Sequence, residues 1–306
     1  ANIIAKMANG IADDLISTTL LATPRPIVIA PAMNNGMWKA PATQANMATL
    51  RERGVHVVGP GSGYLACGDV DTGRMSEPED IVEAVCEVLN PAPQDLAGKR
   101  IVITAGPTHE PIDPVRFIGN RSSGKMGIAL AGEAARRGAE VTLVLGPTSL
   151  DVPRGVECVR VQTAAEMLQA ALSAFQTADA AICAAAVADY TPAAPADHKL
   201  KKVNERLDRI ELVETVDILA ELSRQKGERC VIGFAAETDN VVEYAERKLA
   251  RKGCDAIIAN DVSRADSGFG TDTNKAWIVS TAGTQELPVL TKPQLANTIL
   301  DLLQNL

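Results

Sequence analysis

Residues 101–147 constrain the fold of this chain more than any other segment of its sequence. A β-branched run at 101–104 is followed by Ala-Gly-Pro, which is typical of a buried strand that ends at a turn. Apolar side chains recur at helical spacing over 124–137, and Gly138 predicts the end of that helix. The run at 140–145 predicts a second buried strand. We therefore expect a right-handed βαβ unit whose glycine-rich loop lies at the carboxyl edge of a parallel sheet, where nucleotides and phosphates bind.

Two familiar nucleotide-binding motifs do not fit this loop. Gly119-Asn-Arg-Ser-Ser-Gly-Lys-Met126 nearly matches the phosphate loop G-x-x-x-x-G-K-[ST], but Met126 stands where a magnesium-binding hydroxyl is required. This excludes a P-loop NTPase. A dinucleotide fold needs G-x-G-x-x-G and an acidic residue at the end of the next strand. Here that strand ends at Leu145-Gly-Pro147, so the sequence does not favour NAD.

The loop is nevertheless unusually polar. Cations, an amide and backbone donors near a helix start would stabilise a phosphate or a developing oxyanion. The alternative is a solvated loop with a capping serine. We favour a binding site, because packing gives no reason to concentrate these side chains between glycines. The polar residues are Arg116, Asn120, Arg121, Ser122, Ser123 and Lys125.

Composition limits the remaining possibilities. A chain of 306 residues can bury more than one core, so two domains are expected. The net charge of −8 and pI near 5.1 argue against a general nucleic-acid binder. The sequence has no apolar run of membrane-spanning length, no signal peptide and no C-x-x-C pair among its six cysteines. We expect a cytoplasmic protein without a zinc site or a disulfide framework.

The segment TAGPTHEPIDPVRFIGNRSSGKMG resembles the signature of phosphopantothenate–cysteine ligases. The whole chain resembles the bacterial bifunctional family of coenzyme A biosynthesis, in which this ligase follows a phosphopantothenoylcysteine decarboxylase. The resemblance implies an α/β protein with three parts. Residues 1–90 would be the C-terminal portion of a flavodoxin-like, FMN-dependent decarboxylase domain, 91–95 a linker, and 96–306 a Rossmann-like doubly wound ligase domain.

The first ninety residues contain few strands. Apolar residues at helical spacing begin at Ile3 and continue to Leu20, strands are predicted at 26–30 and 55–58, and helices at 42–53 and 79–89. Two or three strands are too few for a free-standing doubly wound sheet. We therefore expect an N-terminal portion of this domain to be missing.

Two motifs in this part of the chain carry the decarboxylase resemblance. Pro31-Ala-Met-Asn-Asn-Gly-Met-Trp38 resembles the P-x-M-N-x-x-M-W element of FMN-dependent cysteine decarboxylases, in which the Asn holds the substrate carboxylate. That role falls on Asn34, although an Asn that caps a turn is the alternative. Cys67 lies in a glycine-rich loop that resembles the family's substrate flap, and would return a proton to the aminoenethiol intermediate. Arg74 would hold this flap or the substrate.

The family's decarboxylases also use a histidine from a part that precedes this sequence. His56, His109 and His198 do not replace it, because they lie in a strand, the ligase loop and a lysine cluster. Residues that contact FMN would also lie mostly upstream. We expect this chain alone to be a poor decarboxylase, although its complete parent would have that activity.

In the ligase part, a fully apolar strand predicted at 180–187 delivers small residues and then Asp189 to the carboxyl edge. Ala184 and Ala185 would allow close approach of a base or ribose. The resemblance implies nucleotide contacts for these residues, whereas an N-capping Asp after a core strand is the alternative for Asp189.

Three lysines follow a proline-rich arm that begins beside this edge. A charge run usually marks a solvated surface. The resemblance instead implies a K-x-K-K flap over the triphosphate, formed by Lys199, Lys201 and Lys202, with Lys199 contacting the phosphates.

Further along the chain, the resemblance implies five more nucleotide-binding residues. Asp217 and Ile218 open a helix, and Phe234 would pack on cytosine, although a strand Phe is more often part of a core. Lys248 and Lys252 lie at i,i+4 spacing and repel each other unless an anion lies between them. A solvated helix face is the alternative for this pair.

The implied reaction is a two-step ligation. The phosphopantothenate carboxylate attacks CTP with the help of Mg²⁺, and the cysteine amine then attacks the acyl-cytidylate and releases CMP. Asn120 would hold the intermediate and Arg116 would assist the second step. CTP rather than ATP follows only from the resemblance, the metal ligands are unknown, and a ligase dimer is expected. The rival hypotheses are a nicotinamide-binding oxidoreductase and a non-catalytic regulatory relative.

Overall fold

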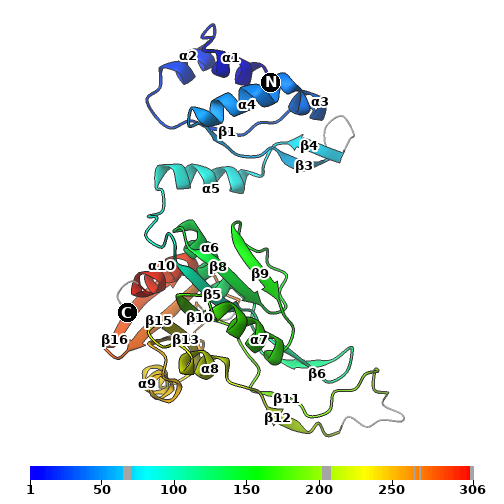
Figure 1. Ribbon diagram of the computed structural model, residues 1–306, viewed down its shortest axis with the longest axis vertical. Helices are drawn as coiled ribbons and strands as arrows, with labels where there is room; N and C mark the ends of the chain where they lie inside the picture. The colour runs from blue at the N-terminus through cyan, green and yellow to red at the C-terminus, as the bar shows by residue number, and fades with distance from the viewer. Residues whose placement is uncertain (65–69, 202–207, 265, 269, 304–306) are drawn as a thin grey trace. The chain divides into compact units, whose positions relative to one another are not determined.

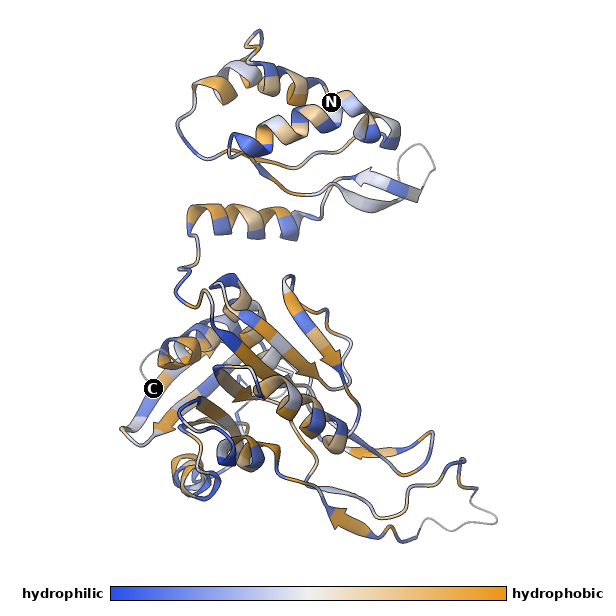
Figure 2. Cartoon of the chain, viewed as in Figure 1, coloured by the Kyte–Doolittle hydropathy of each residue, from blue (hydrophilic) through white to orange (hydrophobic). Residues whose placement is uncertain are grey.

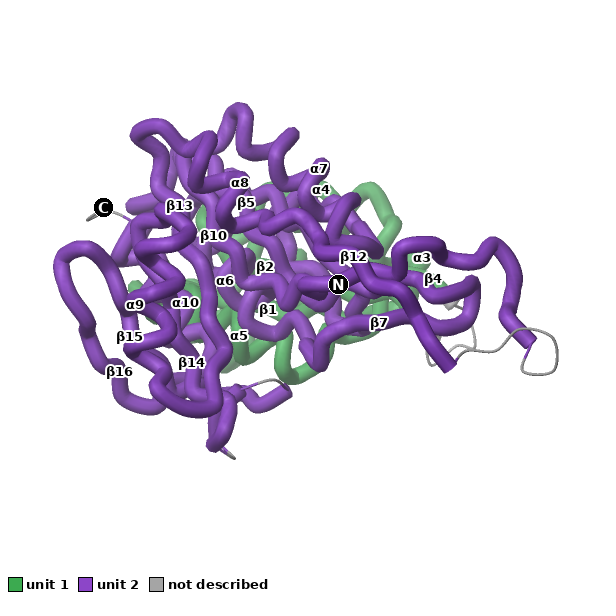
Figure 3. Tube along the Cα trace, turned by 90° about the horizontal axis from the view of Figure 1, so that it is seen from below, with its two compact units in different colours: residues 1–92 green, residues 93–306 purple. Residues whose placement is uncertain are grey.

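The computed structural model describes residues 1–64, 70–201, 208–264, 266–268 and 270–303. The chain divides into two compact units, Ala1–Ala92 and Pro93–Leu306 (Figure 3). None of the helices in the described ranges is long and apolar enough to span a membrane.

Unit 1 is built around a parallel pair of short strands, a hairpin and flanking helices (Figure 1). The helical pattern at the start of the chain forms two helices, because Gly10 takes up a left-handed conformation with φ of 68° and ends the first one. Asp14 then caps the second helix by accepting from the Ser17 N–H at 2.8 Å. The predicted strands are shorter than expected. The elements are α1 Asn2–Asn9, α2 Leu15–Ala22, β1 Val28–Ile29, α3 Asn35–Lys39, α4 Pro41–Glu52, β2 His56–Val57, β3 Gly61–Tyr64, β4 Val70–Arg74 and α5 Pro78–Leu89.

Unit 2 is an eight-stranded sheet in the order β16-β15-β14-β13-β10-β5-β8-β9. Six of these strands run parallel, and β15 and β16 add antiparallel pairings at one edge. This confirms the doubly wound α/β fold predicted for the ligase part. The strands are β5 Arg100–Ala105, β8 Glu140–Leu145, β9 Val156–Arg160, β10 Ala180–Cys183, β13 Cys230–Glu237, β14 Ala256–Asp261, β15 Thr273–Ser280 and β16 Gly283–Thr291.

Helices cover both faces of this sheet. Alternate side chains of β5 enter different cores: Ile103 packs with α6 and α10, whereas Val102 packs with α7, α8 and α9. Each such fully buried aliphatic side chain contributes about 1.5–3 kcal/mol to stability. The two layers therefore hold the carboxyl edge of the sheet rigid. The helices are α6 Lys125–Arg136, α7 Ala164–Phe175, α8 Ile218–Arg224, α9 Val241–Lys252 and α10 Lys292–Leu303.

The strand predicted at 180–187 is wrong in its extent, because regular pairing ends at Cys183. Beyond that point the backbone still runs alongside the end of β5: the Ala184 N–H donates to Thr104 O at 3.1 Å and the Ala186 N–H to Gly106 O at 2.9 Å. An isolated parallel bridge joins Ala186 to Pro107. The carboxyl edge is thus an irregular continuation of the pairing rather than a regular strand.

Two antiparallel ribbons leave the sheet at this edge, β6 His109–Pro111 with β7 Phe117–Gly119, and β11 Tyr190–Pro192 with β12 Leu212–Glu214 (Figure 1). Hydrophobic residues colour β12 in Figure 2, and Val213 is exposed. These ribbons therefore present apolar side chains to solvent.

Candidate functional site

A cleft of about 950 Å³ lies at the carboxyl edge of unit 2, between the sheet and helices α8 and α9. A second cavity of about 290 Å³ lies beside it, and the two have in common the lining residues Ala185, Val187, Asp189, Phe234 and Lys248. Most of the predicted nucleotide-binding residues meet here. The large cleft is lined by Ala185, Asp189, Asp217, Ile218, Phe234, Lys248 and Lys252, and the small cavity also by Asn120 and Ala184.

Three predicted site residues in the flap and the adjacent loop do not line these cavities. Lys199 and Lys201 are exposed, and neither they nor Arg116 line the two cavities. Lys202 lies outside the described residues. The sequence therefore identified the walls of the cleft, while the contact expected between Lys199 and a nucleotide stays a prediction.

Helix α9 supplies the basic wall. The Lys248 ammonium donates to Phe234 O at 2.7 Å, and burial lowers its pKa although the carboxylates of Glu237 and Asp189 act in the opposite direction. No ion pair within the described ranges includes Lys248. Phe234 is half-buried and lines both cavities, which leaves part of its ring available to a ligand.

Lys252 differs from Lys248 because it has a carboxylate partner. Its ammonium is paired with Asp217, which also caps α8 by accepting from the Ala220 N–H at 2.9 Å. The expectation that an anion must separate the two lysines is therefore wrong for Lys252, whose charge Asp217 already balances. Sequence reasoning missed Arg247 and Arg251, which line the same cleft. The run of basic residues at the end of α9 is the sequence feature that could have identified them.

The glycine-rich loop approaches the sheet closely. Gly124, with φ of 80°, precedes α6, and a Cβ there would lie 3.4 Å from the Cα of Gly106. A Cβ at Gly127 would lie 2.3 Å from Ala105 Cβ, so only glycine lets α6 pack this tightly on β5. Asn120 extends from this loop and donates through Nδ2 to Val187 O at 2.8 Å.

Arg116 lies at the root of the predicted flap. Its guanidinium is paired with Asp113 and also donates to Leu200 O at 2.9 Å, while Asp113 accepts from the Leu200 N–H at 3.2 Å. The Arg116 guanidinium holds the pKa of the buried Asp113 carboxyl well below its usual range. Both groups thus fix the backbone between Lys199 and Lys201. Sequence reasoning missed Asp113, although Asp-Pro-Val-Arg is a turn pattern that signals such a carboxylate.

Two further lysines line the small cavity, Lys125 from the polar loop favoured as a binding site and Lys292, which the sequence analysis did not single out. Lys125, the first residue of α6, donates to Gly270 O at 2.9 Å and to Asp272 Oδ1 at 2.7 Å. Lys292, the first residue of α10, is buried and donates to Asn274 Oδ1 at 2.6 Å. Nothing in the local sequence distinguishes Lys292 from an ordinary helix-start lysine. Residues 270–274 thus supply acceptors to both lysines.

In unit 1, Asn34 caps α3, since its Oδ1 accepts from the Gly36 N–H at 2.8 Å. The same segment packs on the β3–β4 hairpin: the Met33 N–H donates to Gly73 O at 3.0 Å, and a Cβ at Gly73 would lie 2.3 Å from Met33 O. Arg74 of β4 is paired with Glu77. Cys67 belongs to the connection between β3 and β4, outside the described residues.

Metal-binding side chains do not cluster in the described ranges, where no group of three or more His, Cys, Asp and Glu residues could hold an ion. A Mg²⁺ ion needs few protein ligands when substrate phosphates supply oxygen atoms. The carboxylates along the large cleft, Asp189 and Glu237 among them, fit such a phosphate-carried ion better than a protein cage.

The comparisons with known families agree with this division of the chain. Residues 96–306 match the family described as the DNA/pantothenate metabolism flavoprotein C-terminal domain, and residues 1–90 match the Flavoprotein family. The expectation that an N-terminal portion of the first domain is missing stays a prediction. The two family matches place the chain among two-part flavoproteins of pantothenate metabolism.

The relatives narrow this class further. The chain is 49% identical to the coenzyme A biosynthesis bifunctional protein CoaBC of Bacillus subtilis (strain 168), over 98% of its own length and 74% of that protein. It is 48% identical to CoaBC of Escherichia coli (strain K12), over 98% and 75% of the two chains. A crystal structure of the C-terminal domain of CoaBC is 47% identical with a TM-score of 0.59, covering 68% of this chain and 97% of that one. This chain belongs to the family of bifunctional coenzyme A biosynthesis proteins.

Proposed function

We propose that unit 2 ligates cysteine to phosphopantothenate at the expense of CTP. The observation that supports this most is a pair of adjacent cavities, one lined by Asn120 and the other by Lys252, that share Asp189 and Lys248, although these residues come from distant parts of the sequence. An amide and cations around these adjacent cavities suit a reaction in which a carboxylate is activated by a nucleoside triphosphate.

In the first step, a carboxylate oxygen of phosphopantothenate attacks the α-phosphorus of CTP. The bond from the α-phosphorus to the bridging oxygen breaks, and pyrophosphate leaves with its electron pair. The Lys248 ammonium and the other cations of α9 stabilise the phosphate charge, and Lys199 approaches from the flap. Mg²⁺ carried by the triphosphate would neutralise part of the same charge.

In the second step, the cysteine amine attacks the acyl carbonyl of the acyl-cytidylate. The amide forms, CMP leaves, and the amine loses its proton. Asn120 holds the intermediate through its side-chain amide, which in the ligand-free chain donates to Val187 O at 2.8 Å. Arg116 orders the flap root through Leu200 O and would assist this step from there.

Unit 1 belongs to the Flavoprotein family, which supports FMN as the cofactor of a decarboxylase half in the complete protein. When bound, FMN would take up the two electrons released on oxidation of the cysteinyl thiol and would return them to the product after CO₂ leaves. The exposed Asn34 amide, on a segment packed against β4, fits a contact with the substrate carboxylate. Cys67 would return the proton.

The location and assembly also follow as proposals. The family relationship supports a cytoplasmic enzyme of small-molecule metabolism. Exposed apolar side chains on the two ribbons, Phe117 and Val213 among them, support a ligase dimer.

The ligase proposal is tested by pyrophosphate release from the full chain with phosphopantothenate and either CTP or ATP. CTP should be the better substrate. Asn120→Asp should accumulate little amide product, and Lys199→Gln should slow pyrophosphate release about 100-fold, as removal of a group that stabilises transition-state charge does. The exposed Lys99→Gln is the matched control. Unchanged rates in the first two variants would remove those assignments. Binding of a pyridine nucleotide without pyrophosphate release would support the oxidoreductase alternative.

A further inference from the structure

The segment 184–189 forms a wall that the two cavities share. Ala185, Val187 and Asp189 line both of them. Regular strand pairing ends before this segment, at Cys183, so its peptide groups depend on individual partners. The orientation of the wall is therefore set by the side chains that bind its backbone.

Thr108 binds the backbone on both sides of Val187. Its N–H donates to Ala186 O at 3.3 Å, and its Oγ1 accepts from the Ala188 N–H at 2.9 Å. The residue is fully buried, with 0% of its surface exposed, and it does not line either cavity. Loss of the hydroxyl would leave a buried donor, the Ala188 N–H, without this acceptor.

The peptide group between Val187 and Ala188 is held at both of its polar ends. Thr108 Oγ1 accepts from its N–H, while Asn120 Nδ2 donates to its carbonyl, Val187 O, at 2.8 Å. The carbonyl and the N–H of one planar peptide group turn together. Thr108 therefore fixes the direction of the carbonyl that Asn120 binds.

This contact also orients the amide of Asn120. One N–H of Nδ2 donates to Val187 O, and this bond sets the plane in which the second N–H can reach a ligand. Asn120 lines the small cavity, where we place the acyl intermediate. The hydroxyl of Thr108 thus acts on the amide through a single peptide group.

The nucleotide side of the same wall has a partner of its own. Thr215 Oγ1 donates to Ala188 O at 2.6 Å, and the Thr215 N–H donates to Asp189 O at 2.9 Å. Thr215 and Asp189 both line the large cleft. Loss of the Thr108 hydroxyl should therefore disturb the acyl side of the wall more than the nucleotide side.

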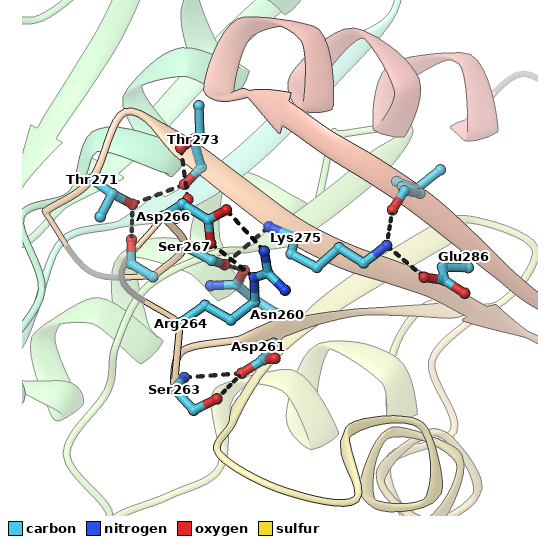
Figure 4. A network of polar contacts seen from close by, with 12 residues as sticks. Asn260, Asp261, Ser263, Arg264, Asp266, Ser267, Thr271, Thr273, Lys275 and Glu286 are labelled. Atoms are coloured by element: carbon cyan, nitrogen blue, oxygen red, sulfur yellow. Dashed lines mark hydrogen bonds and ion pairs between the residues drawn. The ribbon is translucent and has the colours of Figure 1, made fainter.

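A second polar network at this edge of the sheet shows what distinguishes Thr108. Ser267 Oγ donates to Asn260 Oδ1 at 3.0 Å and accepts from the Lys275 N–H at 2.9 Å (Figure 4). The contacts drawn there join β14, β15, β16 and the loop between β14 and β15 to one another. None of the residues labelled in Figure 4 has a part in the proposed reaction. The network around Thr108 instead ends on Asn120, which has one.

We propose that Thr108 is a positioning residue for Asn120 and acts through the Val187–Ala188 peptide group. This inference rests on the ligase proposed above, in which Asn120 holds the acyl-cytidylate. Without the hydroxyl, the peptide group turns and the Asn120 amide loses its fixed direction. The step that slows is the attack of cysteine on the intermediate, because this step depends on how the intermediate is held.

The test is ligation by the full chain with Thr108→Val, which keeps the shape of the side chain but removes the hydroxyl. The kcat for amide formation should fall about 10- to 100-fold, as misplacement of a reacting group by about 1 Å does, with the KM for CTP within about twofold. Thr108→Ser should restore most of the rate. Thr142→Val, at the amino end of the sheet, removes a hydroxyl that donates to Glu157 at 3.3 Å and should match the wild type.

A double-mutant cycle separates positioning from a general loss of structure. In single turnovers of the Asn120→Ala variant, the further change Thr108→Val should alter the rate of amide formation by less than about twofold, because the residue through which Thr108 acts is absent. Equal losses with and without Asn120 would overturn the proposal. A loss that Thr108→Ser does not restore, or an unchanged kcat in Thr108→Val, would overturn it as well.

Magnetic resonance tests the same contact without turnover. In Thr108→Val, the side-chain amide signals of Asn120 should shift and the Ala188 N–H should exchange faster, whereas both should stay unchanged in Thr108→Ser. If the wild type forms no amide but these signals respond, the ligase fails and the positioning of Asn120 stands. If it ligates and the signals do not respond, the positioning fails and the ligase stands. Should Thr108→Val fail to fold, Thr108→Cys, whose sulfur is a weaker acceptor, carries the same test with a smaller loss.

Discussion

The cations in and near the two cavities are of two kinds. Lys252 and Arg116 have carboxylate partners of their own, Asp217 and Asp113. The half-buried Lys248 and the buried Lys292 donate to neutral acceptors, and no ion pair among the described residues includes either. A cation with a built-in partner holds elements of the fold together, whereas a buried cation without one is stabilised when an anionic ligand arrives. The positions of these residues in the sequence do not distinguish the two kinds of cation, whereas their partners in the structure do.

Lys248 and Lys252, two residues of one helix, give the largest expected contrast. Lys248→Met should lower kcat/KM for CTP about 100- to 1000-fold, because it removes a desolvated donor that faces developing phosphate charge. Lys252→Met should lower it only about 3- to 10-fold, since Asp217 already balances that ammonium. Pyrophosphate release measures both, with Lys99→Met as the control. Equal losses would show that the ion pair opens when the nucleotide binds, and the distinction between the two kinds of cation would fail for α9.

The pH dependence of stability sharpens the same comparison at Lys292. Burial and the nearby Lys125 lower its folded-state pKa to about 8, below the unfolded value near 10.5, so the unfolded chain binds more protons between these values. The free energy of unfolding should therefore rise with pH from about 8 to 10.5, and the penalty for the buried charge should be fully present below pH 8. We expect this contribution to be about 1–3 kcal/mol.

Urea titrations of the wild type and Lys292→Met across this pH range measure the effect. The variant should lack this rise and be the more stable protein near pH 7. Lys125 and Asp272 face the same region, and Lys125→Met should raise the pKa of Lys292 and shift the rise toward higher pH. Parallel curves of unfolding free energy against pH for the wild type and Lys292→Met would show that folding does not lower the pKa of Lys292.

The sequence was sufficient for the ligase fold because its signals are local. The β-branched run of β5, the glycines before α6 and the helical spacing behind them each predict their own element, and the right-handed βαβ rule joins them. The predicted strand through Val187 was too long, because regular pairing ends at Cys183 and only single contacts with residues 104–108 continue beyond it. An unbroken apolar run does not show where regular pairing stops.

Such local patterns do not predict the partners of the cations. The burial of Lys292 depends on how β15 and β16 lead the chain to α10, which packs against α6. The spacing of residues within α10 does not predict this packing. The family resemblance implied a nucleotide contact for Asp217, but its pairing with Lys252 depends on how α8 and α9 pack. Burial and charge balance are properties of the assembled edge.

The smallest expected effect concerns Arg116. It has a carboxylate partner but lies outside the cleft, so it tests there the comparison between cations with and without such a partner. Asp113→Asn keeps the size of the side chain but removes the charge that holds the guanidinium, so the flap root at Leu200 should be less ordered. Because the pair acts on Lys199 only through the backbone, we expect the KM for CTP to rise about 2- to 5-fold with kcat nearly unchanged, as a modest loss of binding order would give. Amide exchange at Leu200 should quicken at the same time. A kcat loss of 100-fold or more in Asp113→Asn, with no change in exchange at Leu200, would place Arg116 among the groups that act directly on the reacting atoms. In that case, a carboxylate partner would no longer distinguish a structural cation from a catalytic one.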